Sequence, residues 1–210
     1  MRTPLFIAGI AVLGLVWLGP LHKLAPGPFA AHMTMHMGVV AIAAPLVAFA
    51  VAGGAWDPAR RWPVLFPPLT ASVLELIAVW SWHAPGPHTW ARSTTTGLVL
   101  EQATFLLSGL WLWLAAFGGD PARRETRSAQ GGVALLLTSM HMTLLGALLA
   151  LPPRALYAHH AHHAHGGLTP LEDQHLGGAI MLVIGGLVYL VGGLMLAAQL
   201  LKRIHAERLR

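Results

Sequence analysis

Residues 176–201 read LGGAIMLVIGGLVYLVGGLMLAAQLL, an apolar stretch without a charged side chain. The hydrocarbon core of a bilayer is about 30 Å thick, and about 20 residues of helix cross it. Because lipid offers no partner to backbone N–H and C=O groups, such a stretch should be helical. Its glycines at 178, 185–186 and 192–193 recur about every seven residues, which favours close packing on a neighbouring helix. The stretch therefore predicts a transmembrane helix within a bundle.

Shorter apolar stretches precede this one along the chain. The predicted helices cover residues 5–19, 33–54, 69–82, 97–118, 131–151 and 170–201. The 210 residues are 55% hydrophobic and 10% charged, with a mean hydropathy of +0.61. Soluble domains carry about 25% charged residues, so this composition indicates a chain that has the bilayer as its solvent. We predict an all-α, polytopic membrane protein with a single transmembrane domain over residues 1–210, a bundle of about six transmembrane helices.

Two of the shorter stretches have a second interpretation. Residues 69–82 end with Trp80 and Trp82, which suit the headgroup region, and a re-entrant segment is the alternative to a full crossing. Residues 5–19 follow Arg2 and precede a small-residue segment at 29–31, a pattern that is also typical of a cleaved secretory signal. Whether the first stretch is cleaved or retained, the remaining helices keep the same orientation.

The basic residues predict the orientation in the membrane. Ten of the thirteen Lys and Arg residues fall on one side of the predicted bundle: Arg2, Arg60, Arg61, Arg123, Arg124, Arg127, Lys202, Arg203, Arg208 and Arg210. The positive-inside rule places that side, and both termini, in the cytoplasm. The formal net charge of +5 is explained by these short-loop signals, so we expect no nucleic-acid partner.

Histidine has the opposite distribution, since only His205 of the thirteen falls on the predicted cytoplasmic side. The segment 32–37 reads HMTMHM, and on a helix His32 and His36 share a face, as do Met33 and Met37 on a neighbouring one. Imidazole and thioether together suit copper, and thioether favours Cu(I). The absence of cysteine fits an oxidising compartment. The alternative is methionine that fills gaps in the bundle and histidine that binds headgroups.

Two polar side chains fall well inside predicted helices. Polar groups at such depth are costly and rarely face lipid, so His141 should point into the bundle toward a metal or another polar group. Glu75 lies two turns before His83 on about the same face, where it would hold a proton or orient a histidine. Glu101, near the start of the helix at 97–118, is a milder case because the helix N-terminus favours an acidic group.

The last predicted helix begins with a capping box, Thr169-Pro170-Leu171-Glu172, which explains those residues by helix initiation. Asp173 and His175 follow it and face apart. Upstream, residues 158–165 form a low-complexity outer loop that is expected to collect metal loosely. Its histidines are His159, His160, His162, His163 and His165.

An ordered set of motifs links these residues to a family. It comprises His32-Met33 with His36-Met37; Trp82-His83 followed by Pro85; Leu100-Glu101 followed by FLLSGL at 105–110; PRALY at 153–157; and GLTPLEDQ at 167–174 followed by LGG at 176–178. In these motifs the chain resembles the CtaG-type cytochrome c oxidase assembly factors of bacterial membranes, over roughly residues 30–195.

The resemblance implies a role in the maturation of haem–copper oxidase, by copper handling at the periplasmic face of the bacterial inner membrane. Oxidase subunit I or II, other copper chaperones and the bilayer would be the partners. By position it points to His32, His36, His83, Glu101, His141 and Asp173. Two departures are Gln102, where the family usually has His, and His175, where it usually has Gln. The candidate ligands are thus His32, Met33, His36, Met37, His83, His141, Asp173 and His175, supported by Glu75, Glu101 and Gln102.

We therefore predict an assembly factor that binds or delivers copper, as Cu(I). One alternative is a b-type haem protein with two histidine ligands within the membrane. Another is a divalent-metal transporter, against which no acidic or histidine ligands continue toward the cytoplasmic side. An enzyme is not expected, because no Ser-His-Asp order, HExxH motif or phosphate-binding glycine loop occurs in the sequence.

Overall fold

The computed structural model describes residues 1–20, 24–157 and 168–208, and within them the chain is helical without any β-strand. The α-helices are α1 (Thr3–Leu18), α3 (Pro28–Met37), α4 (Ala44–Val51), α5 (Pro58–Arg61), α6 (Pro68–His83), α7 (Pro85–Ser93), α8 (Thr95–Phe117), α9 (Arg124–Ala150), α10 (Pro170–Ile180) and α11 (Gly186–Arg208). Two π-helical segments, η1 (Gly38–Ala43) and η5 (Met181–Gly185), join α3 to α4 and α10 to α11. Short 3-10 turns are η2 (Pro63–Leu65) and η3 (Pro121–Arg123). The all-α prediction is confirmed.

Four helical segments in the described part of the chain are long and apolar enough to cross a membrane. They are Pro28–Val51, Thr95–Phe117, Glu125–Ala150 and Pro170–Arg208. The helices α1 and α6 have 16 residues each and correspond to the two predicted stretches that had a second interpretation. The chain is thus a membrane protein by its helices, and the number of six crossings stays a prediction.

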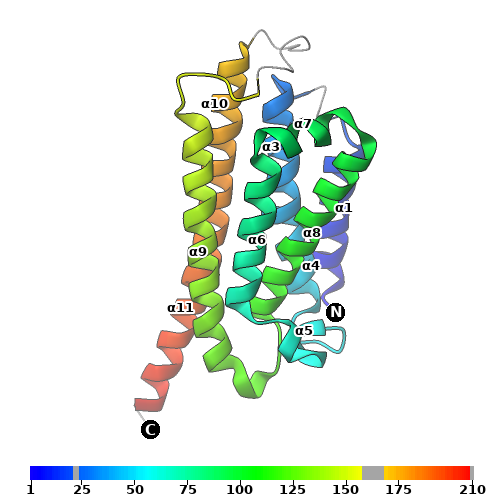
Figure 1. Ribbon diagram of the computed structural model, residues 1–210. Coiled ribbons are helices and arrows are strands. Elements are labelled where there is room, and N and C mark those ends of the chain that lie inside the picture. The colour runs from blue at the N-terminus through cyan, green and yellow to red at the C-terminus, as the bar shows by residue number, and fades with distance from the viewer. Residues whose placement is uncertain (21–23, 158–167, 209–210) are drawn as a thin grey trace.

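The long helices run side by side, and the two marked chain ends lie at the same end of the bundle (Figure 1). That end also carries α5 and the connection between α8 and α9, with Arg60, Arg61 and Arg123, and we call it the arginine end. The start of α3, the end of α6 and all of α7 lie at the other end, which we call the histidine end. The predicted metal-collecting loop at 158–165 lies outside the described residues.

Small residues let the helices approach closely. A Cβ atom at Gly178 would lie 2.5 Å from the backbone nitrogen of Ala150, and one at Gly193 would lie 2.8 Å from the Leu136 side chain. The predicted glycine stripe therefore packs on α9. At the other side of the bundle α1 packs on η1 and α4, where a Cβ atom at Gly9 would lie 3.3 Å from the backbone of Val47.

The π-helical segment η1 has a structural cause that the sequence carries. The Ala44 N–H bonds the carbonyl of Val39, five residues back. In that register the next donor would be Pro45, which has no N–H. The Val40 carbonyl instead accepts from Trp113 Nε1 at 3.2 Å and from the Tyr189 hydroxyl at 3.3 Å. The irregular turn is thereby fixed to α8 and α11, one helical turn beyond His36.

Candidate metal site at the histidine end

Three imidazoles meet inside the histidine end. His32 and His36 lie on one face of α3, as the spacing predicted, and His83 is the last residue of α6. The ring centroids are 6.4 Å apart for His32 and His36, 5.8 Å for His32 and His83, and 5.3 Å for His36 and His83. None of the three side chains is more than 4% exposed. The helical spacing and the end of α6 thus gather three buried rings from two helices.

The nitrogen atoms of these rings are short of hydrogen-bond partners. Neither nitrogen of His32 or His36 forms a hydrogen bond within the described residues, and Nε2 of His83 also lacks one. His83 Nδ1 lies 2.6 Å from the Val79 carbonyl, which only accepts, so Nδ1 carries the proton. In this neutral tautomer Nε2 carries a free lone pair, and a neutral imidazole nitrogen of this kind ligates metals.

The short helix α7 adds a fourth imidazole that the sequence did not single out. His88 is 2% exposed, and its ring lies edge-on to His32 with centroids 5.2 Å apart. The Tyr157 ring is tilted against that of His88 with centroids 4.2 Å apart, and its hydroxyl donates to the His83 carbonyl at 2.6 Å. Burial raises the pKa of Tyr157 to about 12, so it remains a phenol that can donate this bond. Tyr157 therefore covers the rings from the loop that precedes α10.

A carboxylate borders the imidazoles on α8. Glu101 Oε2 lies 3.7 Å from His32 Nδ1, and it accepts a hydrogen bond from Arg92 of α7. Burial lowers the pKa of Arg92, and the neighbouring Glu101 carboxylate opposes that shift. Gln102 Nε2 also donates to Glu101 Oε2 at 3.2 Å, and Gln102 accepts from Trp17 Nε1 of α1 at 3.1 Å. Glu101 thus lies beside His32 and Gln102 contacts Glu101, and their supporting role stays a prediction.

Asp173 holds the helix that carries His32 and His36. Its Oδ2 accepts from the Phe29 N–H at 2.8 Å and its Oδ1 from the Ala30 N–H at 2.9 Å. Because the first N–H groups of a helix have no partner within the helix, Asp173 of α10 caps α3 from outside. Gly27 precedes α3, and a Cβ atom there would collide with this carboxylate. Asp173 thus fixes the start of α3, one turn from His32.

The methionines of the same motif face another way. A Cβ atom at Gly177 of α10 would lie 2.9 Å from Met33 Cγ, and one at Gly185 of η5 would lie 3.3 Å from Met37 Sδ. The same Gly185 Cβ atom would lie 3.3 Å from Cβ of Met142 on α9. The thioethers therefore pack toward α9, α10 and η5, whereas the imidazoles face α6, α7 and α8. The structure does not bring the two predicted donor types onto one side of α3.

His141 and Glu75 form a deeper polar layer. Ser72 Oγ of α6 and Thr138 Oγ1 of α9 are 2.8 Å apart, which sets the register of these two parallel helices. Three residues further along each helix lie Glu75 and His141, at the same height. Glu75 Oε1 accepts from the Tyr189 hydroxyl at 2.6 Å, while Glu75 Oε2 and both His141 nitrogens have no hydrogen bond in the described residues. Glu75 precedes His83 by eight residues on α6, so this polar layer lies about 12 Å from His83 along the helix axis.

His175 is the last predicted ligand, and it lies apart from the imidazoles of α3 and α6. Its Nε2 is 2.9 Å from the Pro152 carbonyl, in the loop after α9. Gln174 also binds this loop by accepting from the Leu156 N–H at 2.6 Å, and it donates to the Leu149 carbonyl at the end of α9 at 3.1 Å. His175 and Gln174 therefore shape the loop that carries Tyr157.

The imidazole set fits a shared ion in spacing. With metal–nitrogen bonds of about 2 Å, two imidazoles on one ion have centroids about 5 to 6.5 Å apart. The four described pairs, at 5.2 to 6.4 Å, fall in that range. Within the described residues no three His, Asp or Glu side chains already have donor atoms in metal-binding positions. Ligation thus requires rotation of the rings, which is open to His32 and His36 because no hydrogen bond fixes their nitrogens.

The comparisons with known proteins agree with the motifs. Over residues 1–203 the chain matches the family described as cytochrome c oxidase caa3 assembly factor (Caa3_CtaG). The match extends beyond the motifs at both ends and includes α1 and most of α11. No curated protein and no solved structure matches the chain. The resemblance predicted from the sequence is confirmed, and the chain belongs to the cytochrome c oxidase caa3 assembly factor family.

Proposed function

We propose that this protein assists cytochrome c oxidase assembly by binding a copper ion among His32, His36 and His83, with His88 as a fourth ligand. The observation that carries the proposal is that both ring nitrogens of His32 and of His36, and Nε2 of His83, are buried without hydrogen-bond partners in the described residues. A buried polar group without a partner costs about 1–3 kcal/mol, and a bound ion removes that cost. Imidazole binds copper as well as zinc. We favour copper because the family assists the assembly of cytochrome c oxidase, a haem–copper enzyme.

The proposed site has an outer position. The imidazoles lie at the histidine end, opposite the arginine end that the positive-inside rule assigns to the cytoplasm. We propose that copper, as Cu(I), enters and leaves on the periplasmic side of a bacterial inner membrane and passes to oxidase subunit I or II or to another copper chaperone. Below the rings, the centroid of Phe105 lies 4.0 Å from that of His36, and Val79 and Val40 are buried nearby. This apolar floor favours delivery on one side over transport across the membrane.

Within this proposal the residues have different tasks. His83, oriented by the Val79 carbonyl, offers Nε2, and His32 and His36 rotate toward the same ion. Glu101 stabilises the charge of the ion from beside His32, and Arg92 holds the carboxylate in place. Asp173 positions α3. The thioethers of Met33 and Met37 lie on the far side of α3 and are left outside the proposed ligand set.

Metal analysis of the purified protein tests the proposal. The loop histidines at 159, 160, 162, 163 and 165 would first be changed to serine, so that loose binding does not hide the site. This protein, in detergent, should retain about one Cu(I) per chain after desalting, with nitrogen ligands in the X-ray absorption spectrum and no Soret band. The double variant His32→Ala/His36→Ala should lose the copper, while His205→Ala, an exposed histidine at the arginine end, should retain it.

Equal copper retention in the double variant would contradict the site. Sulfur scatterers in the spectrum would instead show that Met33 or Met37 turns toward the ion. In cells, the double variant should also fail to restore oxidase activity to a strain without the protein. Full restoration would separate the assembly role from copper binding.

A further inference from the structure

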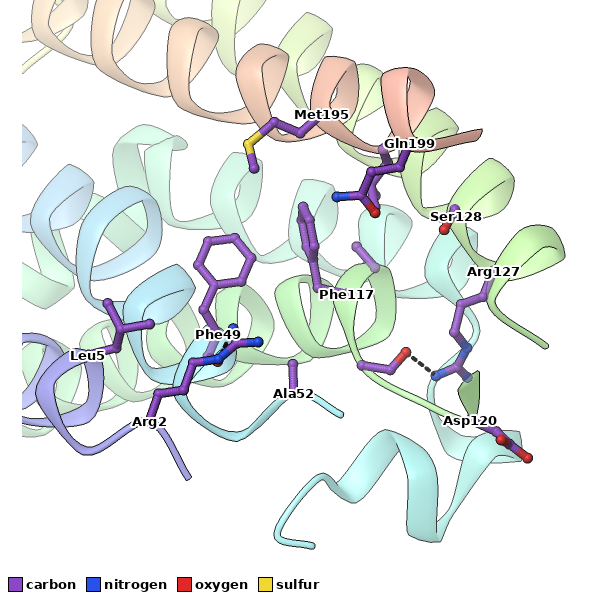
Figure 2. Close-up of a pocket in the computed structure, with 13 residues that line it drawn as sticks. Arg2, Leu5, Phe49, Ala52, Phe117, Asp120, Arg127, Ser128, Met195 and Gln199 are labelled. Atoms are coloured by element: carbon purple, nitrogen blue, oxygen red, sulfur yellow. Dashed lines mark hydrogen bonds between the residues drawn. The ribbon is translucent and has the colours of Figure 1, made fainter. Parts of the chain in front are cut away.

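A cavity of about 400 Å³ lies at the arginine end, far from the imidazoles (Figure 2). It is bordered by the start of α1, the ends of α4 and α8, the first turns of α9, and α11. Arg2, which precedes α1, and Gln199 of α11 lie on opposite sides of it, with Phe49 and Phe117 between them. The lining thus combines polar groups with aromatic rings.

A second cavity, of about 360 Å³, adjoins the first, since Phe49 and Met195 line both. The second is an apolar groove between the η1–α4 segment and α11, and all its lining side chains are apolar: Ala41, Ile42, Pro45, Leu46, Phe49, Trp113, Leu187, Val188, Val191 and Met195, together with Gly192. Trp113 lies at its base because its Nε1 donates to the Val40 carbonyl. Together the two cavities form one amphipathic site.

The polar part of this site carries net positive charge. Arg2 is exposed, and Nη1, one of its five N–H donors, binds the Phe49 carbonyl at 3.3 Å. The four hydrogen bonds of Arg127 in the described residues all go to carbonyl oxygens, which do not neutralise its charge. Two carboxylates oppose these cations: Asp120 in the lining, and the buried Asp57, whose charge acts on Arg127. Lys202 and Arg203, exposed on α11 just beyond Gln199, add further positive charge.

We propose that this site binds a phospholipid with an anionic headgroup. The headgroup phosphate contacts Arg2 and Gln199, and one acyl chain lies in the groove between α4 and α11. Guanidinium groups recognise phosphate through paired N–H donors. Basic pockets between helices on the cytoplasmic side are typical sites for anionic lipids. A soluble anion would use the first cavity but has no use for the apolar groove that adjoins it. This lipid site is independent of the copper proposal.

Lipid titration of the purified, delipidated full chain tests the headgroup. Native mass spectrometry should show that phosphatidylglycerol binds more tightly than phosphatidylcholine with the same chains. Arg2→Gln should weaken phosphatidylglycerol binding about fivefold, the factor equivalent to about 1 kcal/mol for one cation near an anionic lipid. Arg60→Gln, an exposed arginine at the same end that does not line the cavity, should leave it unchanged. Equal affinity for the two lipids would overturn the assignment.

A second pair of variants tests the acyl chain. Val191 lines the groove and is 53% exposed, whereas Leu194 lies one turn along α11, is 54% exposed and lines neither cavity. Val191→Trp should fill the groove and reduce phosphatidylglycerol binding severalfold, and Leu194→Trp should not. Equal effects of the two variants would exclude the groove. If inorganic phosphate raised the unfolding temperature as much as the lipid does, the site would be one for soluble anions and the lipid proposal would fail.

Discussion

The two ends of the bundle bury polar side chains in opposite ways. At the arginine end Asp57 is 1% exposed, and its carboxylate accepts three backbone hydrogen bonds, from Gly53 at 2.8 Å, Ala59 at 2.9 Å and Gly119 at 2.7 Å. At the histidine end His32 and His36 are buried to the same degree. None of their four ring nitrogens has a hydrogen-bond partner in the described residues.

This difference separates architecture from function. The cost of burying Asp57 is offset inside the chain, because the carboxylate ties together two loops and the start of α5. The cost of burying His32 and His36 is not offset by any hydrogen bond in the described residues, although the carboxylate of Glu101 lies 3.7 Å from His32 Nδ1. A leucine would fill the same space without this cost. A fold that only needed to be stable would therefore not retain these imidazoles. We therefore propose that these imidazoles are kept for a ligand from outside the chain, copper.

The largest effect on the free energy of unfolding should come from Asp57, whose carboxylate accepts three hydrogen bonds. Asp57→Ala leaves three N–H groups, two of them in buried hydrogen bonds, without an acceptor and should lower the free energy of unfolding by about 4 kcal/mol. Unfolding by SDS in mixed micelles, followed through the eight tryptophans, measures this change. Asp120→Ala, an exposed carboxylate with one hydrogen bond to the Ala122 N–H, should cost less than about 1 kcal/mol. Similar costs for the two variants would remove the contrast between the ends.

The second effect concerns the imidazoles with their ligand. A ligand that binds only the folded protein stabilises it by about 3 kcal/mol at about 100 times its dissociation constant. Cu(I) should therefore raise the free energy of unfolding by this amount in the protein without loop histidines. The His32→Ala/His36→Ala variant should gain nothing. An equal gain in both proteins would place the copper elsewhere, for example at His141.

The sequence located the main helices because a long apolar stretch is a strong signal. It did not reveal the polar segments by which two of these helices are extended. The helix predicted to begin at residue 131 begins at Arg124, and the last one continues to Arg208. Those segments are helical but polar, so hydropathy does not detect them. The helix α7 was missed for a related reason. Its sequence, PGPHTWARS, has the proline and glycine of a loop, and its helix is held by burial of His88 and Ala91 against the bundle.

The candidate site was predictable only in part. Helical spacing placed His32 and His36 on one face and Met33 and Met37 on another. Spacing alone does not tell which neighbour each face meets, so the separation of imidazoles from thioethers came only with the structure. His88 could have been suggested by its spacing to Arg92, which puts both on one face of a short helix. Asp173 caps α3 through Phe29 and Ala30, which lie 144 and 143 positions away in the sequence. No local sequence pattern predicts such a contact.

The third effect tests Asp173, the satisfied carboxylate beside the imidazoles. Asp173→Asn keeps one acceptor oxygen but brings an NH₂ group against a backbone N–H, and should lower the free energy of unfolding by about 2 kcal/mol. Copper affinity should fall as well, because α3 begins one turn before His32. Glu172→Gln, in the exposed capping box of α10, should cost only about 0.5 kcal/mol and leave copper binding intact. A variant of Asp173 that kept its stability but lost copper would make Asp173 a ligand.

The smallest effect has the opposite sign and tests the contrast most directly. In the metal-free protein, His36→Leu replaces an imidazole without hydrogen bonds by an apolar side chain of similar size against Phe105. The free energy of unfolding should therefore rise by about 1 kcal/mol. His175→Leu removes the contact with the Pro152 carbonyl and should instead lower it by about 1 kcal/mol. SDS unfolding of both variants under a copper chelator gives the comparison. If His36→Leu destabilised the protein as much as His175→Leu does, the His36 ring would be part of the architecture, and the main argument for a metal site would fail.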